Sequence, residues 1–197
     1  MPPSTTRQSA MLLLPHRSAG DYTKLLWGCC WTFKHQIMPA IAIVNCAELQ
    51  QQAIDHLVAE SQREGFRFMK RLVEEYDSGV NRFDQPGEAL LTAIVEGAIV
   101  GIGGLNRDPY FHHPNVGRLR RVYVEAAWRR RGVGRVLVTA LIDAAQPHYQ
   151  LLTLRTDTAA ADAFYQTLGF KTEPRWTHTT HHLQLGDGGD YQPGVIS

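Results

Sequence analysis

Residues 119–135 read LRRVYVEAAWRRRGVGR, and they decide the fold. Apolar residues alternate imperfectly with arginines over the first six positions, which indicates a strand, and residues after 132 have helical spacing. Gly132 and Gly134 carry no Cβ, so a phosphate oxygen can approach the main chain there. A helix start also offers unpaired N–H groups and the positive end of the helix dipole. The stretch therefore predicts a pyrophosphate site between a strand and a helix.

Positive side chains surround this loop, contributed by Arg129, Arg130, Arg131 and Arg135. Two rival phosphate motifs fit poorly. A P-loop needs Lys and then Ser or Thr after the second glycine, where this chain has Arg135 and Val136. A dinucleotide fingerprint needs a small residue where Leu137 stands. A nucleotide-binding protein that uses the same loop is the weaker alternative.

The N-terminal half predicts a strand, two helices and a hairpin. An apolar run at 41–44 is the strand, and the box Asn45-Cys46-Ala47-Glu48 predicts that a helix opens there. A second box, Ser61-x-x-Glu64, predicts another helix, which Gly79 ends. Apolar runs at 90–95 and 99–105 are joined by Glu96-Gly97, which favours a tight antiparallel turn.

Glycines and later periodicity complete the predicted fold. Gly101, Gly103 and Gly104 predict a bulge or a close backbone approach within their strand. A helix from Gly132 to about residue 145 is closed by Pro147. A strand at 151–155, a helix at 159–168 ended by Gly169, and strands near Phe170 and Leu183 follow. This order predicts a layered α+β fold with helices on both faces of a sheet.

Composition narrows the class of protein. The chain has 197 residues, which suits one domain, and its net charge of +1 argues against a dedicated nucleic-acid binder. Three cysteines without metal-ligand spacing make a disulfide framework improbable, which fits a cytoplasmic protein. The apolar run at 11–14 ends at Pro15, too early for a signal peptide or a membrane span.

Periodicity also suggests where the domain lies. Residues 1–37 lack a steady pattern, so we expect a flexible N-terminal extension ahead of a natural start at Met38, with a docking arm as the alternative. The domain is expected to span 38–186. Residues 187–197 are glycine-rich and are expected to form a disordered tail.

Three signals in order resemble the GNAT superfamily of N-acetyltransferases. They are the strand at 119–124, the Arg-x-x-Gly-x-Gly loop at 129–134, and the segment AFYQTLGF at 163–170. The resemblance implies a mixed, mostly antiparallel central sheet of the acyl-coenzyme A N-acyltransferase type. It implies acetyl-coenzyme A as co-substrate, no metal, and an amine of a small molecule or peptide as acceptor. It implies neither a nucleic-acid nor a membrane partner, and leaves a homodimer open.

The resemblance also assigns roles by position. The main chain of Tyr123 and Val124 would pair with the pantetheine arm, and the Val124 N–H would polarise the thioester carbonyl. The tyrosine of the third signal, Tyr165, would protonate the departing thiolate. The pyrophosphate would bind the loop amides between the strand and the helix, at Arg129, Arg130, Arg131, Gly132, Val133, Gly134 and Arg135. A catalytically silent acyl-coenzyme A sensor is the second hypothesis.

One position departs from the family. Many relatives place a glutamate near the start of the central strand, where this chain has Arg118. The departure suggests a base from elsewhere or an acceptor with an acidic group, and by elimination Glu74, Glu75 and Asp108 are the base candidates. The histidines at 178, 181 and 182 lack a matched Cys or carboxylate, so we expect a half-exposed strand and not a metal site.

Overall fold

The computed structural model describes residues 39–111, 113–173 and 176–186. Seven strands form one sheet in the order β1-β2-β3-β4-β5-β7-β6. In chain order the elements are β1 (Ala42–Asn45), α1 (Gln51–Arg63), α2 (Phe68–Asp77), β2 (Ala89–Val95), β3 (Ala98–Arg107), β4 (Val116–Val124), the 3₁₀ turn η1 (Ala126–Trp128), α3 (Val133–Ala145), β5 (Leu151–Leu154), α4 (Ala159–Gln166), β6 (Lys171–Thr172) and β7 (His181–Gln184).

Every neighbouring pair of strands is antiparallel except β4 with β5, which run parallel. The mixed, mostly antiparallel sheet expected from the sequence is therefore confirmed. Glu96 (φ 51°) and Gly97 (φ 83°) both lie in the left-handed region and form the expected turn between β2 and β3.

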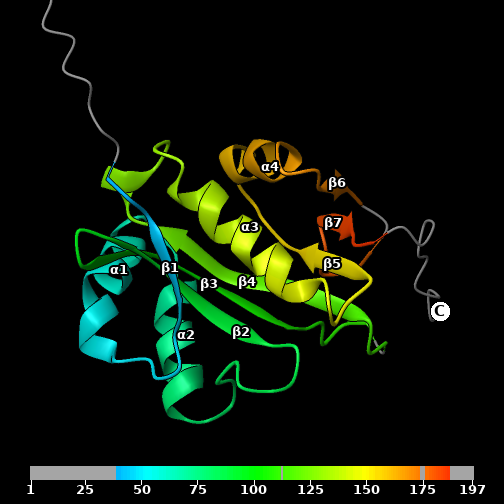
Figure 1. The fold of residues 1–197 in the computed structure, drawn as a ribbon, viewed down its shortest axis with the longest axis horizontal. Helices are drawn as coiled ribbons and strands as arrows, with labels where there is room; N and C mark the ends of the chain where they lie inside the picture. The colour runs from blue at the N-terminus through cyan, green and yellow to red at the C-terminus, as the bar shows by residue number, and fades with distance from the viewer. Residues whose placement is uncertain (1–38, 112, 174–175, 187–197) are drawn as a thin grey trace, which may run out of the picture. The chain divides into compact units, whose positions relative to one another are not determined.

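Helices cover both faces of the sheet, as predicted (Figure 1). Leu137 and Leu141 of α3 pack with Leu105 and Leu119 on one face. On the other face, apolar residues of α1 and α2 pack with strand residues whose side chains point away from α3. The helix residues are Ile54, Leu57, Met69 and Leu72, and the strand residues are Leu90, Ile102 and Tyr123. The period-2 alternation of β2 and β3 divides the core into two layers, and in β4 the irregularity at Arg121 places Leu119 in one layer and Tyr123 in the other.

The glycines of β3 mark close approaches, as predicted. A Cβ on Gly103 would lie 2.9 Å from Leu141 Cδ1 of α3, and one on Gly104 would overlap the Phe83 ring. The ladder between β3 and β4 shifts register between Ile102 and Gly104. Glycine is favoured at both positions because helix and loop side chains occupy the space above them, most tightly at Gly104.

Both predicted capping boxes are wrong. α1 begins at Gln51 and α2 at Phe68, and neither N-cap side chain accepts a capping hydrogen bond from the main chain of its helix. Asn45 remains in β1, and the Cys46 N–H donates to Leu90 O at 2.7 Å, so the sheet occupies the residues of the first box. Ser61 is buried inside α1, while Glu64 binds an arginine far along the chain.

The chain divides after Gln36 into two units, 1–36 and 37–197. The first unit and residues 187–197 lie outside the described residues, so the expectations of an extension and a tail fall there. Within the described part of the chain, no helix has the length and apolar character needed to cross a bilayer.

We predict that Gly104→Ala lowers the free energy of unfolding by about 1–3 kcal/mol, because its Cβ would collide with Phe83. Urea unfolding of the single variant, of Phe83→Ala and of the double variant measures the effect. In the Phe83→Ala background the alanine should cost almost nothing more. Equal costs in both backgrounds would contradict the collision.

Candidate active site

The central strand separates from its neighbour in mid-sheet. β4 pairs with β5 only at Val116–Leu151, Gly117–Leu152 and Arg118–Thr153. Beyond Arg118, the edge of β4 that faces β5 pairs with no strand in the described part of the chain, although β3 still pairs with its other edge. Such an edge can form hydrogen bonds with an amide-rich ligand.

A loop with unpaired amides follows this edge. Arg130 (φ 59°) and Gly132 (φ 85°) both adopt the left-handed conformation, and Gly132 is the N-cap of α3 without a side-chain hydrogen bond. The first main-chain bond of the helix runs from Val136 N–H to Gly132 O at 3.1 Å. Among the described residues, no acceptor pairs with the N–H groups of residues 130–135.

Space above these amides is open. A Cβ built on Gly132 would meet no atom within 4 Å. Unpaired N–H groups, the positive end of a helix dipole and room for a ligand together fit an oxyanion such as a pyrophosphate.

Two carboxylates at the C-terminal end of α1, Glu60 and the C-cap residue Glu64, hold the loop. Arg129 donates to both oxygens of Glu64, at 2.7 and 2.6 Å, and to Val124 O at 2.8 Å. The Ala126 N–H donates to Glu60 Oε1 at 2.6 Å. The hydrogen bond from Arg129 is the main reason that the pKa of Glu64 is lowered. The Arg129 side chain is thus an anchor for the loop and does not point toward the helix start.

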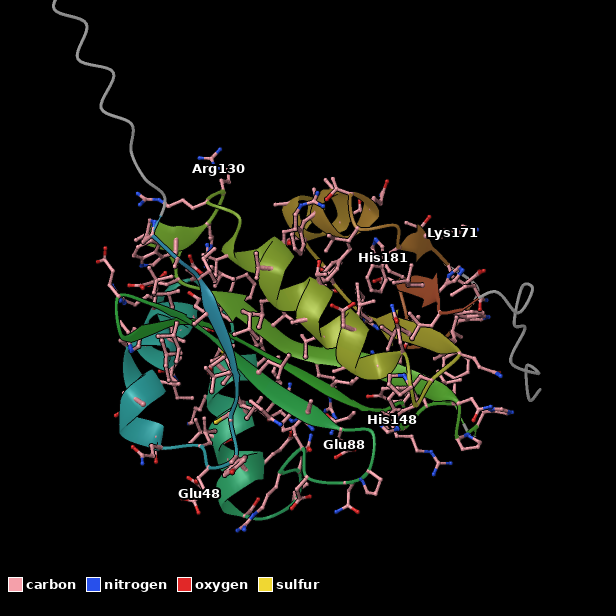
Figure 2. All side chains as sticks on the ribbon, viewed as in Figure 1. Glu48, Glu88, Arg130, His148, Lys171 and His181 are labelled. Atoms are coloured by element: carbon pink, nitrogen blue, oxygen red, sulfur yellow. The ribbon has the colours of Figure 1, made fainter. Side chains whose placement is uncertain are left out.

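The remaining loop arginines have different neighbours from Arg129. Arg130 is exposed and projects outward near the beginning of α3 (Figure 2). The Arg131 guanidinium lies 5.2 Å from the centre of the Trp128 ring, and Arg135 Nη2 lies 3.5 Å from Thr167 Oγ1 of α4. Their charges favour an anion without fixing its position.

The three sequence signals meet at Gly134. A Cβ there would lie 3.4 Å from Phe164 Cζ of α4 and 3.8 Å from Val124 Cγ2 of β4. Tyr165 follows Phe164, so the fold brings the predicted pantetheine strand, phosphate loop and tyrosine into one region. Sequence segments separated by about 30 residues are joined here by the packing of α4 beside the start of α3.

Tyr165 is buried among aromatic neighbours. Its ring lies 5.2 Å from Phe164, 5.5 Å from Phe170 and 6.2 Å from His181, measured between centroids. Burial raises the pKa of its hydroxyl, so the phenol is protonated throughout the physiological range. Within the described ranges, this hydroxyl has no hydrogen-bond partner, and the residue is buried in the core on the α3 face.

His181 is part of an ordinary hydrogen-bond network. Its Nε2 lies 2.9 Å from Asp162 Oδ1, and its Nδ1 lies 2.9 Å from Thr180 Oγ1. Among described residues, no group of three His, Cys, Asp or Glu side chains gathers where it could hold a metal ion.

The three base candidates are all ion-paired. Asp108 is buried against Arg118, whose Nη1 lies 3.1 Å from its Oδ2. Glu75 pairs with an arginine of its own helix and with Arg121 at 2.8 Å; burial would raise its pKa, but these contacts lower it. Glu74 is exposed and pairs with Lys70. The lowered pKa makes Glu75 a weaker base, and all three carboxylates already have cationic partners, so the geometry favours none of them.

A model of the acetyltransferase (GNAT) family matches residues 51–170. The chain belongs to this family. The match spans the loop, the splayed strands and α4, so the resemblance seen in the sequence is confirmed.

Two curated relatives match shorter stretches. N-acetylaspartate synthetase of Xenopus tropicalis is 33% identical over 90 residues, which cover 44% of this chain and 32% of the relative. N-alpha-acetyltransferase RimI of Mycobacterium tuberculosis is 36% identical over 78 residues, covering 38% of this chain and 47% of the relative. The chain thus matches between a third and a half of the length of these relatives.

Solved structures show the same fold. A protein from Exiguobacterium sp. 255-15, provisionally classified as an acetyltransferase, is 27% identical with a TM-score of 0.65, covering 74% of this chain and 93% of that one. The yncA protein of Salmonella typhimurium, solved with its cofactor acetyl-CoA, is 19% identical with a TM-score of 0.57, covering 80% and 99%.

Sequence reasoning missed Glu60 and Glu64 as parts of the site. Glu60 lies in the last turn of α1 and Glu64 is its C-cap, and both precede their partners in the loop by more than 60 residues. Glu64 was interpreted as a helix cap, and no local pattern marks a carboxylate whose partner is that distant.

We predict that Glu64→Gln loses about 1 kcal/mol of unfolding free energy at neutral pH, with allowance for solvent screening. A carboxylate whose folded pKa is lowered contributes stability above its unfolded pKa of about 4.3, and this stability is lost as pH falls through the folded value. The difference from the parent protein should therefore shrink in acid. Urea unfolding at neutral and acidic pH tests this, with the exposed Glu74→Gln as control. A difference in unfolding free energy that is the same at both pH values would contradict a stabilising ion pair between Glu64 and Arg129.

Proposed function

We propose that this protein is an acetyl-coenzyme A-dependent N-acetyltransferase that acetylates a primary amine of a small molecule or peptide by direct attack. The observation that carries the proposal is the run of main-chain N–H groups at residues 130–135 that have no acceptor among the described residues, beside the part of β4 that does not pair with β5. Family membership and a structural neighbour solved with acetyl-CoA support it.

Acetyl-coenzyme A would lie along β4 and across the start of α3. The amides of its pantetheine arm pair with the main chain of Tyr123 and Val124, as a further strand would. Its pyrophosphate accepts from the N–H groups of the loop, and Arg130, Arg131 and Arg135 neutralise part of the charge. Arg129 acts differently from the other three, because it fixes the loop to Glu64.

The transfer itself needs few protein groups. The amine lone pair attacks the thioester carbonyl carbon, the C–S bond breaks, and the nitrogen gives up one proton while the thiolate takes one up. The Val124 N–H would polarise the carbonyl, and closeness of the reactants supplies much of the acceleration. Glu74, Glu75 and Asp108 are all ion-paired. We therefore assign the removal of the amine proton to water molecules that lead to bulk solvent.

Tyr165 would stabilise the leaving group. Its hydroxyl is protonated and has no described partner, so it can donate to the departing sulfur. Because burial raises its pKa above that of a thiol, full proton transfer to the thiolate is uphill and hydrogen bonding carries most of the effect.

The acceptor does not follow from the relatives. The names of the two curated relatives indicate different products, N-acetylaspartate for one and an Nα-acetylated acceptor for the other. Both names nevertheless refer to acetylation at nitrogen, which supports an amine as the acceptor class.

A silent acyl-coenzyme A sensor is the second candidate. The observation that favours it is the pairing of all three candidate bases with cations. A sensor would bind acetyl-coenzyme A in calorimetry but release no thiol with any amine of a broad panel, whereas the enzyme would do both.

We predict that Gly134→Val lowers kcat/KM for acetyl-coenzyme A roughly tenfold or more, because its methyl groups would crowd Phe164 and cover the phosphate amides. S-acetylpantetheine, which has no phosphate, should lose far less as acyl donor. Thiol release measured with both donors tests this. An equal loss with both donors would place the pyrophosphate elsewhere.

We predict that Tyr165→Phe lowers kcat by roughly tenfold or more while the affinity for coenzyme A is retained. The phenyl ring keeps the packing against Phe164 and Phe170, and only the donor to sulfur is removed. Thiol-release kinetics and calorimetry measure the two quantities. Unchanged turnover would remove Tyr165 from the mechanism.

A further inference from the structure

Three arginines of β4 lie together on the α2 face of the sheet. Arg118 and Arg121 each have an acidic partner, and Arg120 lies between them in sequence. Within the described ranges, no carboxylate forms an ion pair with Arg120. Three cations thus face two paired carboxylates, Asp108 and Glu75, and one positive charge remains uncompensated.

The partners of the flanking arginines leave them unavailable to a ligand. Arg118 donates to Asp108 at 3.1 Å, to Thr179 Oγ1 at 3.3 Å and to His178 O at 2.6 Å, and its side chain is buried. Arg121 donates to Glu75 at 2.8 Å, while its buried Nε has no acceptor among described residues. The cluster therefore holds more donors than the surrounding protein has acceptors.

Arg120 differs from its neighbours in both exposure and electrostatics. It is half-buried, so a solute can reach it. Burial lowers the pKa of its guanidinium, and repulsion from Arg121 and Arg118 adds to this. An anion that binds Arg120 would relieve this repulsion in a region partly shielded from water, where charge-assisted hydrogen bonds are strong.

The position of Arg120 along β4 places it near the expected reaction centre. It lies two residues beyond Arg118, the last residue of β4 that pairs with β5, and three residues before Tyr123. It pairs across the sheet with Gly104 of β3. The phenol of Tyr110 is close enough to influence the pKa of the Arg120 guanidinium. An acceptor bound on this face would meet the thioester where the two strands separate.

We propose that Arg120 binds a carboxylate of the acceptor, so that the preferred substrates are amines that carry a carboxylate, such as free amino acids. The inference rests on the proposed acetyl transfer and specifies its acceptor class. A guanidinium suits this role because it can form two parallel hydrogen bonds with a carboxylate, which a lysine ammonium cannot.

The test uses acceptors in matched pairs. Glycine, L-alanine and L-aspartate are compared with their carboxamides by thiol release from acetyl-coenzyme A. Loss of the carboxylate lowers the pKa of the neighbouring amine, so the amides have more neutral amine at a given pH. Intrinsic reactivity therefore favours the amides, and a preference for the acids must come from the protein.

We predict that the parent protein has a kcat/KM for the acids roughly tenfold or more above that for the amides, and that Arg120→Gln removes this preference through KM. Arg120→Lys should retain part of it. Arg63→Gln, which removes an exposed arginine of α1, should leave it intact. Amides used as well as acids by the parent protein, or a preference that survives Arg120→Gln, would overturn the inference while acetyl transfer stands.

Thermal unfolding separates binding from a structural role. Because Arg120 is repelled by its two neighbours, Arg120→Gln should not lower the Tm. A lower Tm together with equal losses for acids and amides would show that Arg120 only supports the fold, and would overturn the inference.

A binding measurement covers the case in which no amine is acetylated, which would remove the proposed function. Calorimetry with coenzyme A-loaded protein then compares N-acetylglycine with N-acetylglycinamide. Selective binding of the acid that Arg120→Gln abolishes supports the carboxylate site. Equal or absent binding of both compounds overturns it.

Discussion

The site depends on the attachment of the loop before α3 to the carboxylates of α1. Glu60 accepts the Ala126 N–H, and Glu64 holds Arg129, which also donates to Val124 O. These contacts fix the loop from outside, so the N–H groups of 130–135 are not needed to hold it. A loop that held itself by its own amides would have none left for a phosphate. Because carboxylates outside the loop hold it in place, its main-chain N–H groups remain open to a ligand.

The separation of β4 from β5 has a similar cause in the packing. Arg118 is the last residue of β4 that pairs with β5, and it is buried with Asp108, which also accepts from Thr153 of β5. This network joins the two strands at one end. Beyond it, Arg121 takes up a positive φ and the β3–β4 register shifts, so β4 follows β3 and leaves β5. Many relatives have a glutamate near the start of this strand. In this chain Arg118 stands there and forms a structural ion pair with Asp108.

Sequence reasoning recovered what depends on local pattern. The Glu96-Gly97 turn and the start of α3 at Gly132 follow from the positive φ that glycine permits, and the close packing on β3 follows from the missing Cβ of its glycines. The capping boxes failed because the same residue types had stronger partners in the sheet and in Arg129. The roles of Glu60 and of the Arg118–Asp108 pair could not be predicted, since contacts between distant residues leave no periodic signal.

The alternation of side chains along β4 relates the two halves of the reaction. Leu119 faces α3, and the core on that face positions the start of the helix and Tyr165. Arg121 and Tyr123 face α1 and α2 instead, and their carboxylate partners Glu75 and Glu64 lie on that side. A ligand paired with the main chain at the free edge of β4 lies between these faces, with phosphate donors at one end and cations beside the middle of the strand. One strand can therefore position an acyl donor through its backbone and an anionic acceptor through its side chains, because the pleat keeps these two sets of groups apart.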